Sequence, residues 1–331
     1  MKHSNYGVTA LVLIITSALS LPAWGVGEPP IMSRISFDQL MQDISNWGRW
    51  GKDDELGTLN LITPEKRLAA AKLVTEGITV SMALELNKTQ DALNANPFEH
   101  ELSRAEFGGH QVAGDKYSVE YHGFAHSHMD GLPHFAHKGK FYNNVPYEAA
   151  EAGGAQRLGI HNAGINGVFT RGVLVDMPRM LGVDFLQPGA AITIADLEAW
   201  EKQSGVTVSS GDVLLIRTGR WAKVKQDGQY DFLKAAAGLH ASVAPWLKAR
   251  DVAVIGCDGV SDVMPSGVEG LVNPLHELVL VGLGMPILDN LDLEALAQQA
   301  VKSGRSTFLF VGAPLRVPGG TGSPLNPLAV F

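Results

Sequence analysis

The histidines of this sequence are concentrated in one short segment. The chain has 331 residues and 11 histidines, so an even spread would put fewer than one in any sixteen residues. Residues 122–137 instead contain His122, His126, His128, His134 and His137. Imidazoles at this density, with an aspartate among them, are typical of a metal site or of acid–base chemistry.

Three side chains of this segment share one face if the chain is extended, because every second residue of a strand points the same way. His126, His128 and Asp130 would then project together. Two imidazole nitrogens and a carboxylate oxygen suit Zn²⁺ or Mn²⁺. Burying them without a shared cation would cost on the order of several kcal/mol. We therefore predict one divalent metal ion, Zn²⁺ or Mn²⁺, held by these residues with a position left for water.

His134 is the predicted catalytic base. Gly131-Leu132-Pro133 ends the extended segment and can turn the chain back over the metal. An imidazole with a reference pKa of about 6.5 can take a proton from water and pass it to a leaving group. We expect His137 to lie at the surface or to support a ligand without touching the metal.

His122 also lies on this face, but farther away. In an ideal strand, His126 is about 6.6 Å from His128, whereas His122 is about 20 Å away. Gly123 would have to bend the chain sharply to close that gap. We therefore expect His122 to support a ligand without touching the metal.

The histidine segment resembles the metal motif of the cyclase family, which includes bacterial kynurenine formamidases and isatin hydrolases. The family pattern is His-x-Gly-Thr-His-x-Asp-x-Pro-x-His, and His128, Asp130 and His134 match its last three polar positions. The segment departs from the pattern at four places. Phe124 replaces the first histidine, His126 the glycine and Ser127 the threonine, and Pro133 is one place late.

Segments outside the motif are also similar to the family. Arg-Gly-Val-Leu-Val-Asp at 171–176 and Gly-Asp-Val-Leu-Leu-Ile-Arg-Thr-Gly at 211–219 resemble two of its strands. Ile-Leu-Asp-Asn-Leu at 287–291 resembles its Ile-Leu-Glu-Asn-Leu, with Asp289 in place of the glutamate. His276 resembles the family's distal histidine, although its apolar surroundings equally suit a buried core residue. The resemblance covers roughly residues 47–331.

The resemblance implies an α/β fold, a swivelling β/β/α-type single domain with a mixed sheet. It implies metal-dependent hydrolysis of a small amide, lactam or lactone, with His276 and Asp289 as possible further metal ligands, and it implies a homo-oligomer. Some relatives hold a second metal, but Phe124 removes one of its ligands here. Trp47 and Trp50, in a glycine-rich loop, are candidates for an aromatic lid over the substrate.

Two other functions remain open. One is hydrolysis of a dienelactone-type lactone, which only an assay would distinguish from formamidase activity. The other is a non-catalytic periplasmic protein that binds a metal or small ligand through the same histidines. His134 distinguishes this second alternative, since a pure binder needs no base beside a complete site.

The elements that must position the site alternate between strands and helices. β-Rich runs lie near 78–86, 116–122, 172–177, 212–218, 252–257 and 307–312, and helical patterns near 64–76, 195–203, 241–250, 272–283 and 292–302. The chain is 45% hydrophobic and 18% charged with a formal net charge of −8. This composition excludes disorder, and the acidic balance makes nucleic acid an unsuitable partner.

The N-terminus predicts export. Met1-Lys2-His3 leads into the apolar run 8–21, which ends in Pro22-Ala23-Trp24-Gly25. The run is short for a membrane span and its end suits signal peptidase. We predict a signal peptide over 1–25 and a mature hydrolase domain over 26–331, periplasmic or secreted and not membrane-bound after cleavage. Since breakdown of tryptophan in the cytosol needs no export, formylkynurenine ranks below an unidentified amide or lactone.

Overall fold

The computed structural model describes Met1 and residues 26–331 of the chain. The predicted signal peptide falls almost entirely on residues 2–25 and so lies outside the described residues. Within the described part, no helix is both long and apolar enough to cross a membrane.

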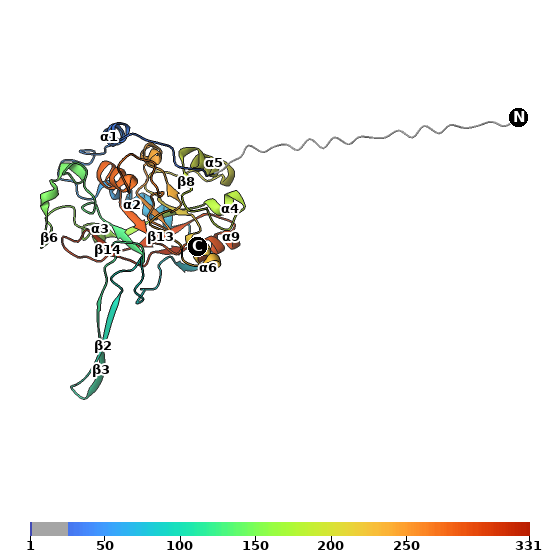
Figure 1. Ribbon diagram of the computed structural model, residues 1–331. Coiled ribbons are helices and arrows are strands. Elements are labelled where there is room, and N and C mark those ends of the chain that lie inside the picture. Colours follow the sequence, from blue (N-terminus) through green and yellow to red (C-terminus); the bar gives the residue numbers. More distant parts are fainter. Residues whose placement is uncertain (2–25) are drawn as a thin grey trace.

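A nine-stranded mixed sheet runs through the centre of the molecule (Figure 1). In spatial order its strands are β1 (Thr79–Ser81), β15 (Leu328–Val330), β13 (Thr307–Gly312), β7 (Val168–Asp176), β9 (Val213–Arg217), β11 (Val254–Cys257), β12 (Ile287–Asp289), β4 (His128–Asp130) and β14 (Gly322–Pro324). The four strands from β7 to β12 are parallel, and the strands outside them pair antiparallel.

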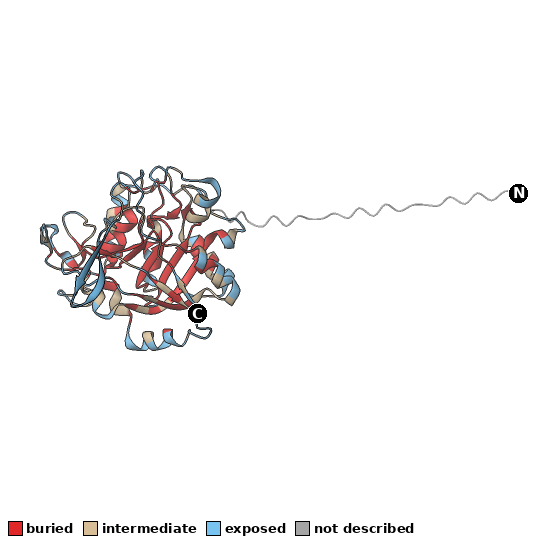
Figure 2. Ribbon diagram, turned by 90° about the horizontal axis from the view of Figure 1, so that it is seen from below, coloured by how far each residue is buried: buried red, intermediate tan, exposed pale blue. Residues whose placement is uncertain are grey.

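Side chains on both faces of the central strands are buried. All five residues of β9 are buried, with Leu214 and Ile216 in one apolar cluster and Val213 and Leu215 in a second. Continuous apolar runs are the sequence pattern of parallel strands covered on both faces. This is why the runs near 172–177, 212–218 and 252–257 were correctly predicted as strands. The run near 307–312 is also a strand, β13, but it pairs antiparallel with both of its neighbours. Figure 2 shows these buried strands between partly exposed helices.

Helices cover the two faces of the sheet. The first cluster contains buried side chains of α1 (Arg34–Asp43), α5 (Ile194–Ser204), α7 (Ala244–Ala249) and the π-helix η5 (Glu277–Leu283), which continues α8 (Pro274–His276). The second contains those of α9 (Glu294–Ser303). The remaining α-helices of the described residues are α2 (Pro64–Ala71), α3 (Ala163–Asn166), α4 (Met177–Leu181) and α6 (Arg220–Asp227). Short 3₁₀ helices lie at η1 (Gly57–Leu61), η2 (Tyr142–Asn144), η3 (Tyr147–Ala149) and η4 (Ala241–Val243). All the predicted helical patterns fall on these elements, although α2 ends five residues before residue 76.

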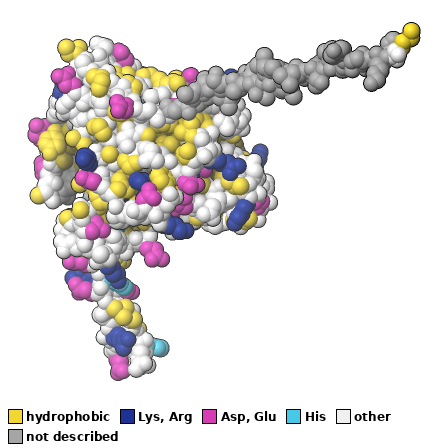
Figure 3. All heavy atoms as spheres, turned by 45° about the vertical axis from the view of Figure 1, so that its right-hand side comes forward, with side chains coloured by type: hydrophobic (Ala, Val, Ile, Leu, Met, Phe, Trp, Pro, Cys, Tyr) yellow, Lys and Arg dark blue, Asp and Glu magenta, His cyan; other side chains and the backbone are white. Residues whose placement is uncertain are grey.

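One part of the chain projects away from this body. β2 (Glu99–Phe107) and β3 (His110–Ser118) form an antiparallel hairpin whose strand residues are all exposed. Gly108 and Gly109 join them with φ of 59° and 82°, as a tight hairpin turn requires. The hairpin extends well beyond the body (Figure 1), and Figure 3 shows it as a narrow stem with acidic, basic, histidine and apolar side chains. The strand predicted at 116–122 is the end of β3, which stops at Ser118.

Candidate metal centre

The site lies where β4 is held between β12 and β14. In the antiparallel pairing of β4 with β12, His128 lies opposite Asp289 and Asp130 lies opposite Ile287. β14 pairs on the other side of β4 and places Gly322 against Asp130. His128, Asp130 and Asp289 are all buried. Segments far apart in the sequence thus bring polar side chains to one buried place.

Asp130 is at the centre of this group. Its Oδ1 atom lies 2.8 Å from Nδ1 of His122 and 3.3 Å from Nε2 of His128. Its Oδ2 atom lies 3.5 Å from Nε2 of His276, which in turn lies 3.2 Å from Oδ2 of Asp289. These residues form two overlapping sets of possible metal ligands, His122–His128–Asp130 and Asp130–His276–Asp289, and Asp130 belongs to both.

The donor atoms of these sets fit a divalent cation. Both carboxylate oxygens of Asp130 and Nδ1 of His122 are buried, and none makes an aligned hydrogen bond despite the short distances. Nδ1 of His276 donates to Asp262 at 2.5 Å, so a neutral ring turns the lone pair of Nε2 toward the carboxylates of Asp130 and Asp289. Lone pairs facing carboxylate oxygens repel unless a proton or a cation lies between them. Nitrogen and oxygen donors in these sets suit zinc or manganese.

The pKa values of Asp130 and His276 also indicate a site that favours positive charge. Burial alone would raise the pKa of Asp130, but the nearby rings of His128, His122 and His276 hold it well below its ordinary value. Burial alone would likewise lower the pKa of His276, whereas the carboxylates of Asp289, Asp130 and Asp262 raise it well above its ordinary value. The site therefore attracts positive charge, which is what a metal centre requires.

Neighbouring polar groups orient these rings. Asp262 accepts from Nδ1 of His276 and from the backbone N–H of Leu275 at 2.7 Å. The hydroxyl of Ser261 donates to Oδ1 of Asp289 at 3.0 Å. Nε2 of His122 lies 3.0 Å from the hydroxyl of Thr321. Such contacts fix the tautomers and orientations of metal-binding side chains.

His134, the predicted base, lies at the rim of the site. Its Nε2 atom is 3.8 Å from Oδ1 of Asp130, and its ring stacks on that of His122 with centroids 3.8 Å apart. About a quarter of its side chain is exposed. Burial among other imidazoles lowers the pKa of His134 to about 4. The ring is therefore neutral at pH 7 and can accept a proton.

The structure places His122, and not the ring of His126, beside Asp130. Strand β4 begins only at His128, and residues 121–127 are irregular, so the alternation expected of an extended chain does not reach His126. Gly123 has φ of 143°, which supplies the bend that the sequence required before His122 could approach. The ring of His126 is buried, belongs to neither ligand set, and has no hydrogen-bond partner at either nitrogen.

Of the other predicted site residues, two lie in a ligand set and two do not. The structure brings His276 and Asp289 into the second ligand set. It places Trp47 against Val281, whose carbonyl accepts from the indole N–H at 2.7 Å. Trp50 carries the guanidinium of Arg49 over its ring. Among the described residues, neither tryptophan hydrogen-bonds to a ligand-set residue or stacks on one, so their role toward a substrate stays a prediction.

His137 is largely buried and lies outside both ligand sets. Its side chain is only 11% exposed and its Nδ1 atom pairs with Glu277 at 2.9 Å.

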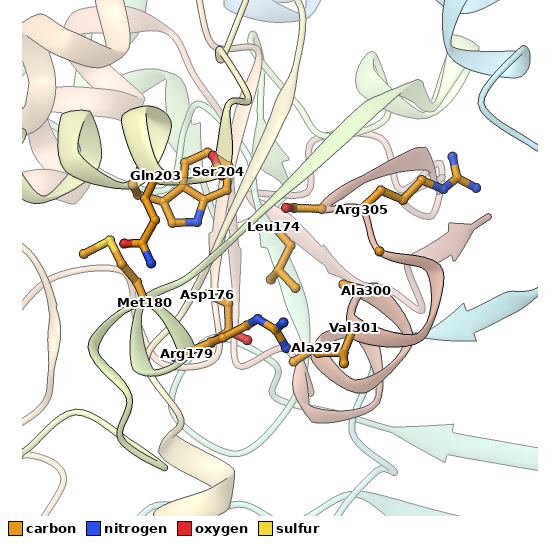
Figure 4. A pocket seen from close by; sticks show the side chains of 13 residues that line it. Leu174, Asp176, Arg179, Met180, Gln203, Ser204, Ala297, Ala300, Val301 and Arg305 are labelled. Atoms are coloured by element: carbon orange, nitrogen blue, oxygen red, sulfur yellow. The ribbon is translucent and has the colours of Figure 1, made fainter.

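The cavity shown in Figure 4, of about 280 Å³, is separate from the metal centre. It lies among α4, α5, α9 and β7, and Arg179 reaches across it toward Ala297.

Several residues of the site were not identified from the sequence. Asp262 follows the buried strand β11 within Asp-Gly-Val-Ser-Asp at 258–262, and an acidic residue after the end of a parallel strand was a usable signal. Thr321 lies in the glycine-rich turn 319–322, whose contact with His122 depends on the pairing of β14 with β4. Tyr121 packs on His122 with ring centroids 4.6 Å apart, and only its place beside the motif indicated it.

The fold and the site define an α/β protein with a buried histidine–aspartate centre suited to a metal. The sequence model of the cyclase family matches residues 41–262, about two thirds of the chain. A crystal structure of a novel cyclase is similar over 88% of this chain and 99% of that one, with 32% identity and a TM-score of 0.79. The chain belongs to the cyclase family.

Isatin hydrolases share the fold at lower identity. Isatin hydrolase A from Ralstonia solanacearum is 20% identical, with a TM-score of 0.51, over 81% of this chain and 97% of that one. An isatin hydrolase bound to the product analogue thioisatinate is 18% identical, with a TM-score of 0.54, over 81% and 99%. No curated protein sequence matches the chain significantly.

Proposed function

We propose that this protein is a metal-dependent hydrolase of a small amide, lactam or lactone. The observation that carries the proposal is the pair of ligand sets that share the buried carboxylate of Asp130. Membership of the cyclase family and the fold shared with isatin hydrolases support hydrolysis as the reaction class. Arylformamidase-like action on a C–N bond is the finer form of the proposal.

Different residues of the chain would bind the metal, transfer the proton and orient the ligands. His122, His128, Asp130, His276 and Asp289 would hold the cation, which when bound supplies a Lewis acid that polarises a carbonyl and acidifies water. His134, neutral and at the rim, accepts the proton of the attacking water at Nε2 and returns it to the leaving nitrogen or oxygen. Asp262 and Ser261 keep His276 and Asp289 oriented for their partners.

The position of His134 favours an enzyme over a protein that only binds a metal. Both ligand sets are complete without it, and its nitrogen is 3.8 Å from Asp130. A partly exposed base beside a complete site serves turnover, whereas a storage or transport site needs none. Lactone hydrolysis would use the same residues, so it remains the second candidate function.

Metal content and hydrolysis together test the proposal. The purified protein should hold zinc or manganese, and a screen of formanilides, cyclic amides and lactones should find a substrate whose turnover a chelator abolishes and the metal restores. Asp130→Asn is the matched control, since it keeps the shape of the side chain and removes the shared negative charge. A protein that binds no divalent metal, or hydrolyses substrates equally well after chelation, would contradict the proposal.

We also propose that the protein is exported and acts in the periplasm or outside the cell, on the basis of the apolar run at 8–21 and the small residues that follow it. Sequencing of the mature N-terminus after expression in a Gram-negative host should give a chain that begins near Val26. A membrane-held chain that begins at Met1 would refute this. The family resemblance further suggests a homo-oligomer, which the mass in solution would reveal.

A further inference from the structure

Asn290 makes an unusual set of contacts one residue beyond Asp289. It is completely buried and has φ of 54°. Its Nδ2 atom donates to the carbonyls of Gly123 at 2.7 Å and His126 at 3.2 Å. Its Oδ1 atom accepts from Nη1 of Arg220 at 2.6 Å. The amide therefore joins the end of β12 to the loop that precedes β4.

The carbonyl of His126 accepts a second hydrogen bond, from Nδ1 of His128 at 2.8 Å. A carbonyl oxygen has two lone pairs and can accept both. The bond fixes the proton of a neutral His128 ring on Nδ1, so the lone pair of Nε2 faces Oδ1 of Asp130 at 3.3 Å. Only that tautomer presents a metal-binding nitrogen to the first ligand set.

Arg220 holds this arrangement from the other side. Its side chain is buried, with the guanidinium 4.2 Å from the centroid of the Trp221 ring and 3.9 Å from that of Phe232. Besides its bond to Asn290, it donates to the carbonyl of Phe124 at 2.8 Å. Within the described part of the chain no carboxylate forms an ion pair with Arg220. Its guanidinium instead donates to the side chain of Asn290 and to the backbone carbonyls of Asp258 and Phe124.

We propose that Asn290, held by Arg220, is a positioning residue for His128. It fixes the carbonyl of His126, which fixes the proton on Nδ1 of His128 and leaves Nε2 free to bind the metal. The inference rests on the proposed metal centre and deepens it. It also gives the backbone of His126 a role that its ring does not have in either ligand set.

Two substitutions of Asn290 test the proposal. Asn290→Asp keeps an acceptor for Arg220 and removes the amide donor. Asn290→Gly removes the whole side chain but tolerates φ of 54° without strain. Each should weaken the affinity of the metal-free protein for Zn²⁺ or Mn²⁺ by about 10- to 100-fold, as loss of an orienting contact to a ligand does. Competition with a chromophoric chelator measures this affinity.

The second readout does not depend on a metal or on activity. In metal-free protein labelled with ¹⁵N at histidine, at a pH where the ring is neutral, the wild type should show His128 as one tautomer with the proton on Nδ1. Both Asn290 variants should show a mixture of the two tautomers. A role confined to general packing would lower the melting temperature without changing the tautomer.

Ser127→Ala is the matched control. The hydroxyl of Ser127 donates to the backbone carbonyl of Asn290 at 2.6 Å and accepts from the backbone N–H of Leu84 at 2.9 Å. Its loss therefore removes two hydrogen bonds, one of them at Asn290, without touching the His126 carbonyl. The control should lose stability and keep the wild-type tautomer and metal affinity within about threefold, since only an indirect contact is lost.

Either of two results would overturn the proposal: a folded Asn290 variant with the wild-type affinity and a single tautomer, or a Ser127→Ala protein that changes both readouts as much as the Asn290 variants do. If one Asn290 variant does not fold, the other decides the question. If the wild type binds neither cation, the proposed function fails. The tautomer comparison then still decides the role of Asn290.

Discussion

The chain forms a histidine–aspartate pair in two very different places. On the hairpin, Nε2 of His100 lies 2.6 Å from Oδ1 of Asp115, and the two side chains are 33% and 54% exposed. In the body, Nδ1 of His122 lies 2.8 Å from Oδ1 of Asp130, and the two side chains are 28% and 1% exposed. The two histidines are exposed to a similar degree, but the carboxylate of the first pair faces solvent, whereas that of the second is buried among other histidines.

The difference shows that the surroundings, more than the pair itself, make a functional centre. An exposed pair gains little because water and salt screen it and both side chains lose freedom. A buried carboxylate without compensation is costly, so it requires several partners or a cation. Asp130 has three imidazoles within 3.5 Å and still keeps both oxygens without an aligned hydrogen bond. The following predictions test this contrast, beginning with the largest effect.

Asp130→Asn should have the largest effect. Because Asp130 belongs to both ligand sets, the change removes the shared negative charge and should abolish metal binding together with activity. We expect turnover to fall by about 10³-fold or more, since the metal-assisted chemistry is lost. Metal content by mass spectrometry and the hydrolysis rate measure the two effects. Full metal occupancy in the folded variant would contradict the central place given to Asp130.

His134→Ala should separate chemistry from binding. His134 is in neither ligand set, so the variant should keep its metal and lose on the order of 10²- to 10⁴-fold in turnover, the usual contribution of a positioned acid or base. Metal content and kcat are the measurements, with Asp130→Asn as the comparison. If His134→Ala lost the metal while Asp130→Asn retained it, the two roles would be reversed.

His122→Ala and His126→Ala should differ in metal affinity. The structure puts Nδ1 of His122 at 2.8 Å from Asp130 and leaves the ring of His126 outside both sets, so we expect a loss of about 10-fold or more for His122→Ala and a smaller one for His126→Ala. Titration with Zn²⁺ or Mn²⁺ measures both, and its stoichiometry tests the predicted single ion against the two ligand sets. A large loss only in His126→Ala would support the sequence-based assignment of His126 as the ligand.

The sequence predicted the body of the fold because its strands carry a simple signal. Runs such as 252–257 are apolar at every position, as expected of strands buried on both faces. The hairpin carries no such signal. Its strands alternate among charged, small and apolar residues, as at Glu101–Phe107, and face water on both sides. The Gly108-Gly109 pair is a turn signal that the sequence analysis did not use.

The site was predicted as a segment but not in its detail. His128 and Asp130 follow from alternation because β4 is a real strand. His122 does not, because its approach depends on the single backbone angle of Gly123. The partners of His276 and Asp289, Asp262 and Ser261, are brought in by tertiary pairing of β11, β12 and β4. Periodicity describes one element at a time and cannot supply contacts between elements.

The smallest effect is expected from Asp115→Ala on the hairpin. The substitution breaks a histidine–aspartate contact of 2.6 Å, which is shorter than the contact of His122 with Asp130. If distance alone set the strength of such a pair, losing this contact would destabilise the fold strongly. Because both side chains are partly exposed and the carboxylate of Asp115 faces solvent, we expect the free energy of unfolding to change by less than about 0.5 kcal/mol. Metal affinity should not change, and urea unfolding with metal titration measures both. A large loss of stability would instead mean that another surface covers the hairpin in solution, and the mass of the variant relative to the wild type would show whether that surface belongs to a second copy of the chain.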